Sequence, residues 1–196
     1  MSVSPAPYSP ILTPMLILLP PSEKKGTEPG PAITVYTGVL YQSLGWATLT
    51  KAAQVRAQKS IAIISAKYGS LKCLDPIEPY KEKIDAAQMR APITKALEAI
   101  ESDLIIDCRS STYQSVWTPP AHKCVEIKVF SKVDGVKKVI THMSKKTRGE
   151  VTRMLLLSTT IPTNPQELAE IVSRAFDCEL FEAKANVPWV LEVIAH

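Results

Sequence analysis

The sequence predicts a single α/β domain in which helices cover a sheet of buried strands. Three continuous apolar runs of strand length carry this prediction, at residues 15–19, 61–64 and 104–106. Such runs suit strands that are buried on both faces, as in a parallel sheet. Segments with apolar residues at helical spacing separate these runs. The length of 196 residues is enough for one domain with a core.

The composition is typical of a soluble globular protein, with 45% hydrophobic and 21% charged residues and a net charge of +4. No apolar segment approaches the roughly 18 residues that a membrane span needs, so we expect no membrane contact. Residues 1–14 hold four prolines and no charged side chain, unlike a signal peptide with a basic start. We therefore expect a disordered leader over residues 1–14 and one domain over residues 15–196.

The cysteines and histidines form no metal-binding pattern, so we expect neither a metal nor another cofactor. No two cysteines are spaced as C-x-x-C, and no second pair of ligands accompanies the neighbouring His122 and Cys124. Scattered single cysteines fit a reducing cytoplasm, where they behave as small apolar residues. The residues concerned are Cys73, Cys108, Cys124, Cys178, His122, His142 and His196.

Local signals place the elements of the first half of the chain. Pro20 and Pro21 end the first apolar run, because proline cannot donate to a sheet ladder. Thr50 is a side chain suited to begin a helix. The expected elements are a connector over residues 27–34, a short helix over 39–44, a helix from Thr50 to about Lys59 with Ala52, Ala53 and Val55 partly buried, the strand at 61–64, and extended chain over 74–80.

The second half carries similar signals. Asp134 and Gly135 form a good hairpin turn, and Thr147 with Glu150 resembles a capping box that begins a helix. Asn164 is expected to open the last helix. The expected elements are a helix over 89–100 with Pro92 in its first turn, a strand at 104–106, a helical turn at 113–117, a hairpin of 125–130 with 136–141, a helix after Thr147 that buries Val151, Met154 and Leu155, and closing strands at 176–181 and 189–194.

Each of the three apolar runs is followed directly by a polar loop. These loops are residues 22–25, 65–68 and 107–110. Because the carboxyl ends of parallel strands meet at one edge of a sheet, we expect the loops to line one crevice. That crevice would hold Lys24 or Lys25, Lys67 and Arg109, together with several hydroxyl groups and one carboxylate.

A second basic segment lies at the predicted start of the helix after Thr147. The first N–H groups of a helix lack partners and the helix dipole is positive there, so a phosphate could bind. A solvated basic helix start is the alternative interpretation. Together with the first loop, the predicted residues for DNA or phosphate binding are Lys24, Lys25, Lys145, Lys146, Arg148, Gly149 and Arg153.

The catalytic candidates are Lys67, Tyr68 and Asp75. A desolvated Lys67 beside Tyr68 would permit imine chemistry. Asp75 and Glu78 would suit an acid and base pair, although carboxylates near prolines more often cap loops. The sequence contains neither a Walker loop nor a G-x-G-x-x-G motif.

Five segments of the chain resemble, in order, the YaaA family of bacterial peroxide stress proteins. The segments are MLILLPPSEKK at residues 15–25, VYTGVLY at 35–41, SAKYGSLKCLDPIEPY at 65–80, LIIDCRSSTYQSVW at 104–117 and ITHMSKKTRGEVTRML at 140–155. The resemblance covers most of the chain after Met15.

The resemblance implies a mixed sheet flanked by helices and a positively charged cleft. It also implies a cytoplasmic protein that binds double-stranded DNA and protects DNA from peroxide, partly by limiting free iron. The positions that match the family or line the expected cleft are Tyr36, Thr37, Gly38, Ser65, Tyr68, Gly69, Asp75, Pro79, Tyr80, Asp107, Arg109, Ser110 and Tyr113, in addition to the basic residues above.

The chain departs from the family pattern in one respect. Family members usually carry a long helical segment between the first strand and the Tyr-Thr-Gly motif, whereas only residues 27–34 span that gap here. The segment between Tyr80 and Leu104 also looks shortened. The family's helix-hairpin-helix contact with DNA is attributed to helical parts of this kind.

Two functional hypotheses from different classes follow. In the first, the protein binds DNA or the phosphates of a nucleotide in a basic cleft. In the second, it is an enzyme acting on a nucleobase, nucleoside or nucleotide, in which Tyr36, Tyr68 or Tyr80 stacks on the base and Asp75 or Asp107 transfers a proton. A third interpretation is an interaction module whose polar cluster only organises the fold.

Overall fold

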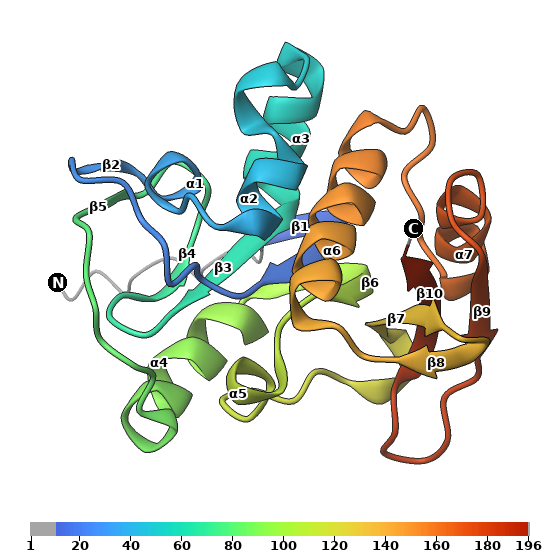
Figure 1. Cartoon of the computed structure of the whole chain (residues 1–196). Coiled ribbons are helices and arrows are strands. Elements are labelled where there is room, and N and C mark those ends of the chain that lie inside the picture. The colour runs from blue at the N-terminus through green and yellow to red at the C-terminus, as the bar shows by residue number, and fades with distance from the viewer. Residues whose placement is uncertain (1–10, 196) are drawn as a thin grey trace, which may run out of the picture.

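The computed structural model describes residues 11–195, in which eight strands form one mixed sheet with helices on both faces (Figure 1). The strand order is β4-β3-β1-β6-β7-β10-β9, and β8 pairs with β7. The fold class is therefore α/β in a single domain, as predicted. The strands of the sheet are β1 (Ile11–Leu19), β3 (Ile61–Ser65), β4 (Gly69–Leu71), β6 (Ile100–Asp107), β7 (Cys124–Val133), β8 (Val136–Lys138), β9 (Cys178–Phe181) and β10 (Trp189–Ala195), while β2 (Gly30–Pro31) and β5 (Pro76–Ile77) pair separately.

The centre of the sheet is parallel. Strands β3, β1, β6, β7 and β10 run in one direction, with Leu18 opposite Asp107 and Leu19 opposite Ile63. The three apolar runs are thus parallel neighbours, which confirms the prediction on which the crevice depended. In chain order these five strands lie as 2-1-3-4-5, a doubly wound arrangement whose order reverses beside β1. In such sheets, ligands bind at the carboxyl ends of the strands next to the reversal.

The helices form a layer on each face of the sheet. They are α1 (Ala32–Val35), α2 (Val39–Leu44), α3 (Lys51–Ser60), α4 (Ala86–Glu98), α5 (Ser111–Gln114), α6 (Thr141–Leu157) and α7 (Pro165–Val172), with single 3-10 turns at Trp46–Thr48 and Ala121–Lys123. Figure 1 shows α2, α3 and α6 on one side of the sheet and α4 with α5 on the other. None of the helices within residues 11–195 combines the length and the apolar character that crossing a bilayer requires.

Strand β1 contributes to two hydrophobic cores, because successive side chains of a strand point to opposite faces. Met15, Ile17 and Leu19 pack in the core beneath α2, α3 and α6. Leu16 and Leu18 pack in the core that α4 covers. Such burial on both faces explains why this segment reads as a continuous apolar run.

Several local predictions are confirmed. Thr50 Oγ1 accepts a hydrogen bond from the Ala53 N–H at 3.2 Å and caps α3. Asn164 Oδ1 accepts from the Glu167 N–H at 3.0 Å and caps α7. Asp134 and Gly135 have φ angles of 52° and 77°, which suit the hairpin turn between β7 and β8.

Other local predictions are wrong. Residues 11–14, assigned to the leader, belong to β1 and pair with β6, while residues 1–10 lie outside the described part of the chain. Ala52 and Val55 are exposed, and Pro92 lies in the interior of α4 rather than in its first turn. Pro92 is exposed, so its ring does not disturb the core that α4 covers.

The helix predicted to begin at Thr147 begins six residues earlier, at Thr141. Thr147 is 1% exposed, and in α6 its segment packs against α2 rather than ending at a capping box. The pattern of Thr147 and Glu150 is therefore not a helix start. A local capping signal was overridden by the burial that a longer helix gains.

Candidate functional site

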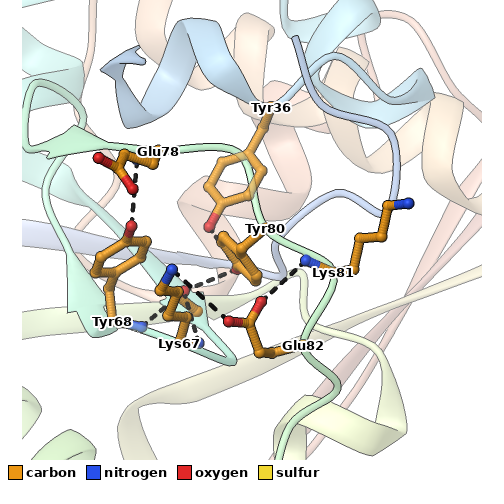
Figure 2. Close-up of polar contacts among 8 residues, drawn as sticks. Tyr36, Lys67, Tyr68, Glu78, Tyr80, Lys81 and Glu82 are labelled. Carbon is orange, nitrogen blue, oxygen red and sulfur yellow. Dashed lines mark hydrogen bonds and ion pairs between the residues drawn. The ribbon is translucent and has the colours of Figure 1, made fainter. Parts of the chain in front are cut away.

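Three tyrosines from separate loops meet above the carboxyl ends of β1 and β3 (Figure 2). We define the tyrosine cluster as Tyr36, Tyr68 and Tyr80 together with Ser65, Lys25 and Lys67. Tyr36 follows α1, Ser65 ends β3, Lys67 and Tyr68 lie in the turn before β4, Tyr80 follows β5, and Lys25 lies in the loop after β1. The cluster therefore occupies the edge where the doubly wound sheet favours ligand binding.

A chain of hydroxyl groups runs through the tyrosine cluster. The hydroxyl oxygens of Tyr36 and Tyr80 are 2.8 Å apart, and the Tyr80 hydroxyl is 2.8 Å from Ser65 Oγ. The backbone N–H groups of Lys67 and Tyr68 donate to Ser65 Oγ at 3.2 and 3.1 Å. All three hydroxyl-bearing residues are buried, so this chain is fixed in place rather than solvated.

The aromatic rings hold a lysine beside this chain. The ring of Tyr80 lies edge-on to those of Tyr68 and Tyr36, with centroids 5.7 and 6.3 Å away. Lys25 Nζ lies 4.0 Å from the centroid of the Tyr80 ring, within the range of a cation–π contact. Burial lowers the pKa of Lys25, although the carboxylates of Glu82 and Glu23 oppose this shift.

Lys67 lies on the outer side of the tyrosine cluster. Its ammonium group is 5.4 Å from the centroid of the Tyr68 ring and 3.7 Å from Glu82 Oε1, and its side chain is 37% exposed. Lys67 is therefore not desolvated, which removes the premise of imine chemistry at this residue. Glu82 was not predicted from the sequence, where the signal was the charged run that directly follows Tyr80.

Backbone contacts explain why these loops approach one another. Lys25 and Tyr36 form an isolated antiparallel bridge, and the Thr37 N–H donates to the Lys24 carbonyl at 3.0 Å. A Cβ at Gly38 would displace the Ser22 hydroxyl and lie 3.2 Å from Ser22 Cβ, so glycine allows the start of α2 to approach the loop after β1 closely. The loop after β1 is also held by Tyr41, whose hydroxyl donates to the Pro20 carbonyl at 2.7 Å.

The turn between β3 and β4 positions Ser65 and Tyr68. Gly69 has a φ of 76°, a conformation that glycine adopts without strain. The Tyr68 hydroxyl accepts a hydrogen bond from the Glu78 N–H at 3.2 Å, so it bonds outside the hydroxyl chain. Thr37 directly follows Tyr36 in the chain. Its hydroxyl oxygen is buried and has no hydrogen-bond partner among the described residues.

Ser110 and Tyr113 lie in the chain that follows β6, the strand next to β1 in the sheet. Ser110 precedes α5, and its carbonyl accepts from the Tyr113 N–H at 2.9 Å. Burial raises the pKa of Tyr113 to about 12, with further contributions from the nearby Tyr80 and Glu23. Tyr113 is thus close enough to the cluster to interact with it electrostatically.

Asp107 and Arg109 are buried under the third loop. Arg109 is 0% exposed, and its guanidinium donates to both carboxylate oxygens of Asp107 at 2.9 and 2.8 Å. It also donates to the carbonyls of Tyr113 and Trp117 at 3.1 and 3.0 Å. These two residues hold α5 and the following chain to the end of β6, and neither presents its charge to solvent.

The side chain of Asp75, the predicted acid or base, is hydrogen-bonded within its own turn. Its Oδ2 accepts from the Lys72 N–H at 2.8 Å, and its carbonyl accepts from the Ala32 N–H at 2.9 Å. These contacts join the loop before β5 to the start of α1. Asp75 therefore organises the loops that carry Tyr36 and Tyr80.

The predicted phosphate-binding residues of α6 begin in its second turn, so they do not form the helix start that the prediction required. Arg148 donates to the Ile127 carbonyl at 3.2 and 3.1 Å, and Arg153 donates to the Leu44 and Gly45 carbonyls at 2.9 and 3.1 Å. Lys146 pairs with Glu150 at 2.9 Å, and Lys145 is exposed. Among residues 11–195, no hydrogen bond or ion pair joins this group to the tyrosine cluster, and its arginines bind α6 to β7 and to the end of α2.

The three buried cysteines, Cys73, Cys108 and Cys124, are poor candidates for direct reaction with peroxide. Burial raises the pKa of Cys73 and of Cys108 to about 12, and it raises the pKa of Cys124 further. The thiolate is the reactive form, so these thiols are held in an unreactive state near neutral pH. Within residues 11–195, no three His, Cys, Asp or Glu side chains are grouped closely enough to hold a metal ion.

The buried tyrosines predict a loss of stability in alkali. Burial raises the pKa of Tyr36 and of Tyr41 far above the ordinary value near 10. The unfolded chain therefore releases these protons first, so their stabilising effect is complete below about pH 10 and is lost as pH rises further. Each fully buried phenol should lower the free energy of unfolding by about 1.4 kcal/mol per pH unit above that point.

Urea unfolding at a series of pH values measures this effect. The urea midpoint should fall steeply above about pH 10, and the slope should be shallower in a Tyr41→Phe variant. A midpoint that does not change over this range would contradict the burial of these hydroxyls.

Two hollows in the described surface lie away from the tyrosine cluster. One follows the outer side of α4 between Ala87 and Glu98, and the other lies beside Trp117 and Lys123. The second includes Trp117, Thr118 and Lys123, but it is also lined by Ile100 and Glu101 at the start of β6, away from the carboxyl edge where ligands of doubly wound sheets bind. The tyrosine cluster therefore remains the strongest candidate site.

Comparison with known proteins agrees with the resemblance of the five segments. Residues 20–180 match the family model described as "Peroxide stress protein YaaA". A UPF0246 protein of Streptomyces coelicolor is 33% identical over 181 residues, which cover 85% of this chain and 69% of that relative. UPF0246 proteins of Corynebacterium efficiens and Corynebacterium glutamicum are 37% and 35% identical over 74% of this chain and 62% of their own length.

Proposed function

Because the chain belongs to the YaaA family of peroxide stress proteins, we propose that its tyrosine cluster binds the phosphate of a nucleotide or of DNA. The observation that carries this proposal is the position of Lys25, a partly desolvated cation above the Tyr80 ring at the ligand-binding edge of the sheet. An anion that reaches this ammonium group encounters hydroxyl groups and aromatic rings that suit a nucleotide. The protein would perform this function in the reducing cytoplasm.

The contacts of α6 favour the tyrosine cluster over the basic helix as the phosphate site. Arg148 and Arg153 already donate to backbone carbonyls, and Lys146 already pairs with Glu150. A phosphate at α6 would have to compete with these partners. Lys25 has the carboxylates of Glu23 and Glu82 in its surroundings, but it forms no ion pair within 4.0 Å among the described residues.

Fluorescence anisotropy with a short, 3′-fluorescein-labelled oligonucleotide tests the proposal. Lys25→Ala should weaken binding by about tenfold, because a charge-assisted contact is lost. For the unaltered protein, the logarithm of the association constant should fall linearly with the logarithm of the salt concentration. The slope should be about −0.7 for each neutralised phosphate of a single strand.

Lys59→Ala is the matched control. Lys59 is an exposed lysine in the last turn of α3, directly before β3, and it therefore lies at the opposite edge of the sheet. Its removal changes the net charge equally but should leave the affinity within about twofold, as expected for a distant charge at physiological salt. Equal losses in the two variants would show that only overall charge attracts the oligonucleotide.

The hydroxyl chain favours enzymatic action on a nucleotide as a second candidate function. Connected hydroxyls beside a desolvated amine can deliver or remove a proton at a bound ligand. In this case, nucleotides incubated with the protein should be converted to a product that chromatography resolves, and Tyr80→Phe should abolish the conversion. Unchanged nucleotides in the presence of a binding-competent protein would limit the function to binding.

A further inference from the structure

The donors and acceptors of the tyrosine cluster do not balance, and this imbalance indicates which kind of phosphate the site accepts. Ser65 Oγ has two lone pairs, and the N–H groups of Lys67 and Tyr68 already donate to it. The Ser65 hydroxyl must therefore donate its proton to a tyrosine. The Tyr80 hydroxyl, at 2.8 Å, is the partner in the chain.

One phenolic proton is then left over. Tyr36 and Tyr80 share one hydrogen bond, in which one of the two hydroxyls donates and the other accepts. The hydroxyl that accepts still carries its own proton, and Ser65 has no remaining lone pair to receive it. The Ser65 hydroxyl also interacts with the Tyr36 hydroxyl, but only as a donor, because both of its lone pairs are occupied. Among the described residues, no other acceptor is hydrogen-bonded to either phenol.

The cluster therefore presents one unpaired hydroxyl donor and lacks an acceptor for it. Tyr36 is 1% exposed and Tyr80 is 7% exposed, so bulk water does not readily compensate for the missing acceptor. Lys25 Nζ lies 4.0 Å from the centroid of the Tyr80 ring and Lys67 Nζ lies 5.4 Å from that of the Tyr68 ring, so two positive charges lie beside the hydroxyl chain. A ligand that fits must supply acceptor oxygens and negative charge, and it needs no donor of its own.

Burial restricts the form that this ligand can take. An internal phosphodiester carries a sugar on each side, whereas a terminal phosphate monoester projects three oxygens beyond its sugar and carries nearly two negative charges at neutral pH. Only the projecting group matches a buried hydroxyl chain beside two lysines.

We propose that the tyrosine cluster selects a terminal phosphate monoester, of a mononucleotide or of a strand end, over internal phosphodiesters. This inference rests on the proposed function and specifies its ligand. The leftover phenolic proton donates to the phosphate, and Lys25 supplies the charge. Lys67 contributes when the phosphate displaces Glu82, whose ion pair at 3.7 Å is exposed and weak.

The test compares two single-stranded oligonucleotides of one sequence, each labelled with fluorescein at the 3′ end and bearing either a 5′-phosphate or a 5′-hydroxyl. The 5′-phosphate should bind about tenfold more tightly, as expected for a charge-assisted hydrogen bond. Its affinity should rise between about pH 5 and about pH 7, as the second phosphate proton with a pKa near 6 is lost. Glu82→Gln should tighten binding of the 5′-phosphate oligonucleotide, because it removes a competing carboxylate.

Tyrosine variants show whether the hydroxyl chain is responsible. Tyr36→Phe and Tyr80→Phe should each reduce the preference for the 5′-phosphate to about twofold or less. Tyr113→Phe is the matched control, because it removes a nearby phenolic hydroxyl that belongs neither to the tyrosine cluster nor to the hydroxyl chain. Circular dichroism shows whether each variant is folded. If Tyr80→Phe does not fold, Tyr36→Phe alone tests the role of the hydroxyl chain.

The outcomes separate this inference from the proposed function. If both oligonucleotides bind equally and Lys25→Ala weakens both, phosphate binding stands and selection of the monoester is wrong. If neither oligonucleotide binds, both proposals are wrong. Competition by unlabelled dAMP would assign the site to mononucleotides. A preference for the 5′-phosphate without such competition would assign it to strand ends. Both results support selection of the phosphate monoester.

Discussion

Arg109→Met should destabilise the protein by about 3–5 kcal/mol, the usual cost of removing one partner of a buried ion pair. The variant leaves the Asp107 carboxylate buried without the guanidinium that now donates to both of its oxygens. It also deprives the Tyr113 and Trp117 carbonyls of their donor, so the chain after β6 should loosen. Chemical denaturation monitored by circular dichroism measures the loss.

Arg174→Met is the control for this prediction. Arg174 follows α7 and is exposed, so its replacement should change the free energy of unfolding by no more than about 0.5 kcal/mol. In addition, Asp107→Asn combined with Arg109→Met should cost less than the sum of the single variants, because neither charge is then left alone. An Arg109→Met protein as stable as Arg174→Met would contradict the buried pair.

Gly149→Ala should cost about 3 kcal/mol, although alanine is the better helix former by about 1 kcal/mol. A Cβ at Gly149 would lie 2.2 Å from the Leu40 carbonyl oxygen and 2.8 Å from Ser43 Cβ. The first of these atoms belongs to the backbone of α2, so relief requires α2 and α6 to separate. The expected decrease in Tm is about 6–12 °C for a domain of this size.

Gly26→Ala is the comparison for this variant. A Cβ at Gly26 meets only the Val35 carbonyl oxygen at an ordinary 3.9 Å, so the Tm should change by no more than about 2 °C. A gain in stability for Gly149→Ala would mean that helix propensity dominates at this position and that α2 and α6 are not in close contact.

The roles of Gly149 and Arg109 show where sequence patterns mislead. Gly149 was predicted to admit a phosphate, but it admits the backbone of a neighbouring helix. Arg109 was predicted to line a crevice, but it is fully buried in a hydrogen-bond network. A sequence indicates that a residue is polar or small, whereas its partner depends on contacts between distant segments.

The central sheet was predictable because its signal does not depend on such partners. The apolar runs that became β1, β3 and β6 are buried on both faces, and each is followed by a loop that lies at the carboxyl edge. The start of α6 was not predictable in this way. Thr147 carries a capping pattern, yet the helix continues past it because its burial against the fold outweighs the local preference.

The tyrosine cluster was predicted in part. Tyr36, Ser65, Tyr68 and Tyr80 were selected from their loops, but the hydrogen bonds that join them span up to 44 positions of the chain. Neither these bonds nor the approach of Glu82 to Lys67 has a signature in sequence spacing. Hydroxyl-bearing residues after buried strands indicate that a site exists, and only the fold shows which of them touch.

A crystal structure of the protein with bound dAMP tests the central claim most directly. The phosphate should lie within hydrogen-bonding distance of Lys25 Nζ and of the Tyr36 or Tyr80 hydroxyl. Phosphate density against Lys145 or another basic residue of α6, with none beside Lys25, would contradict the account.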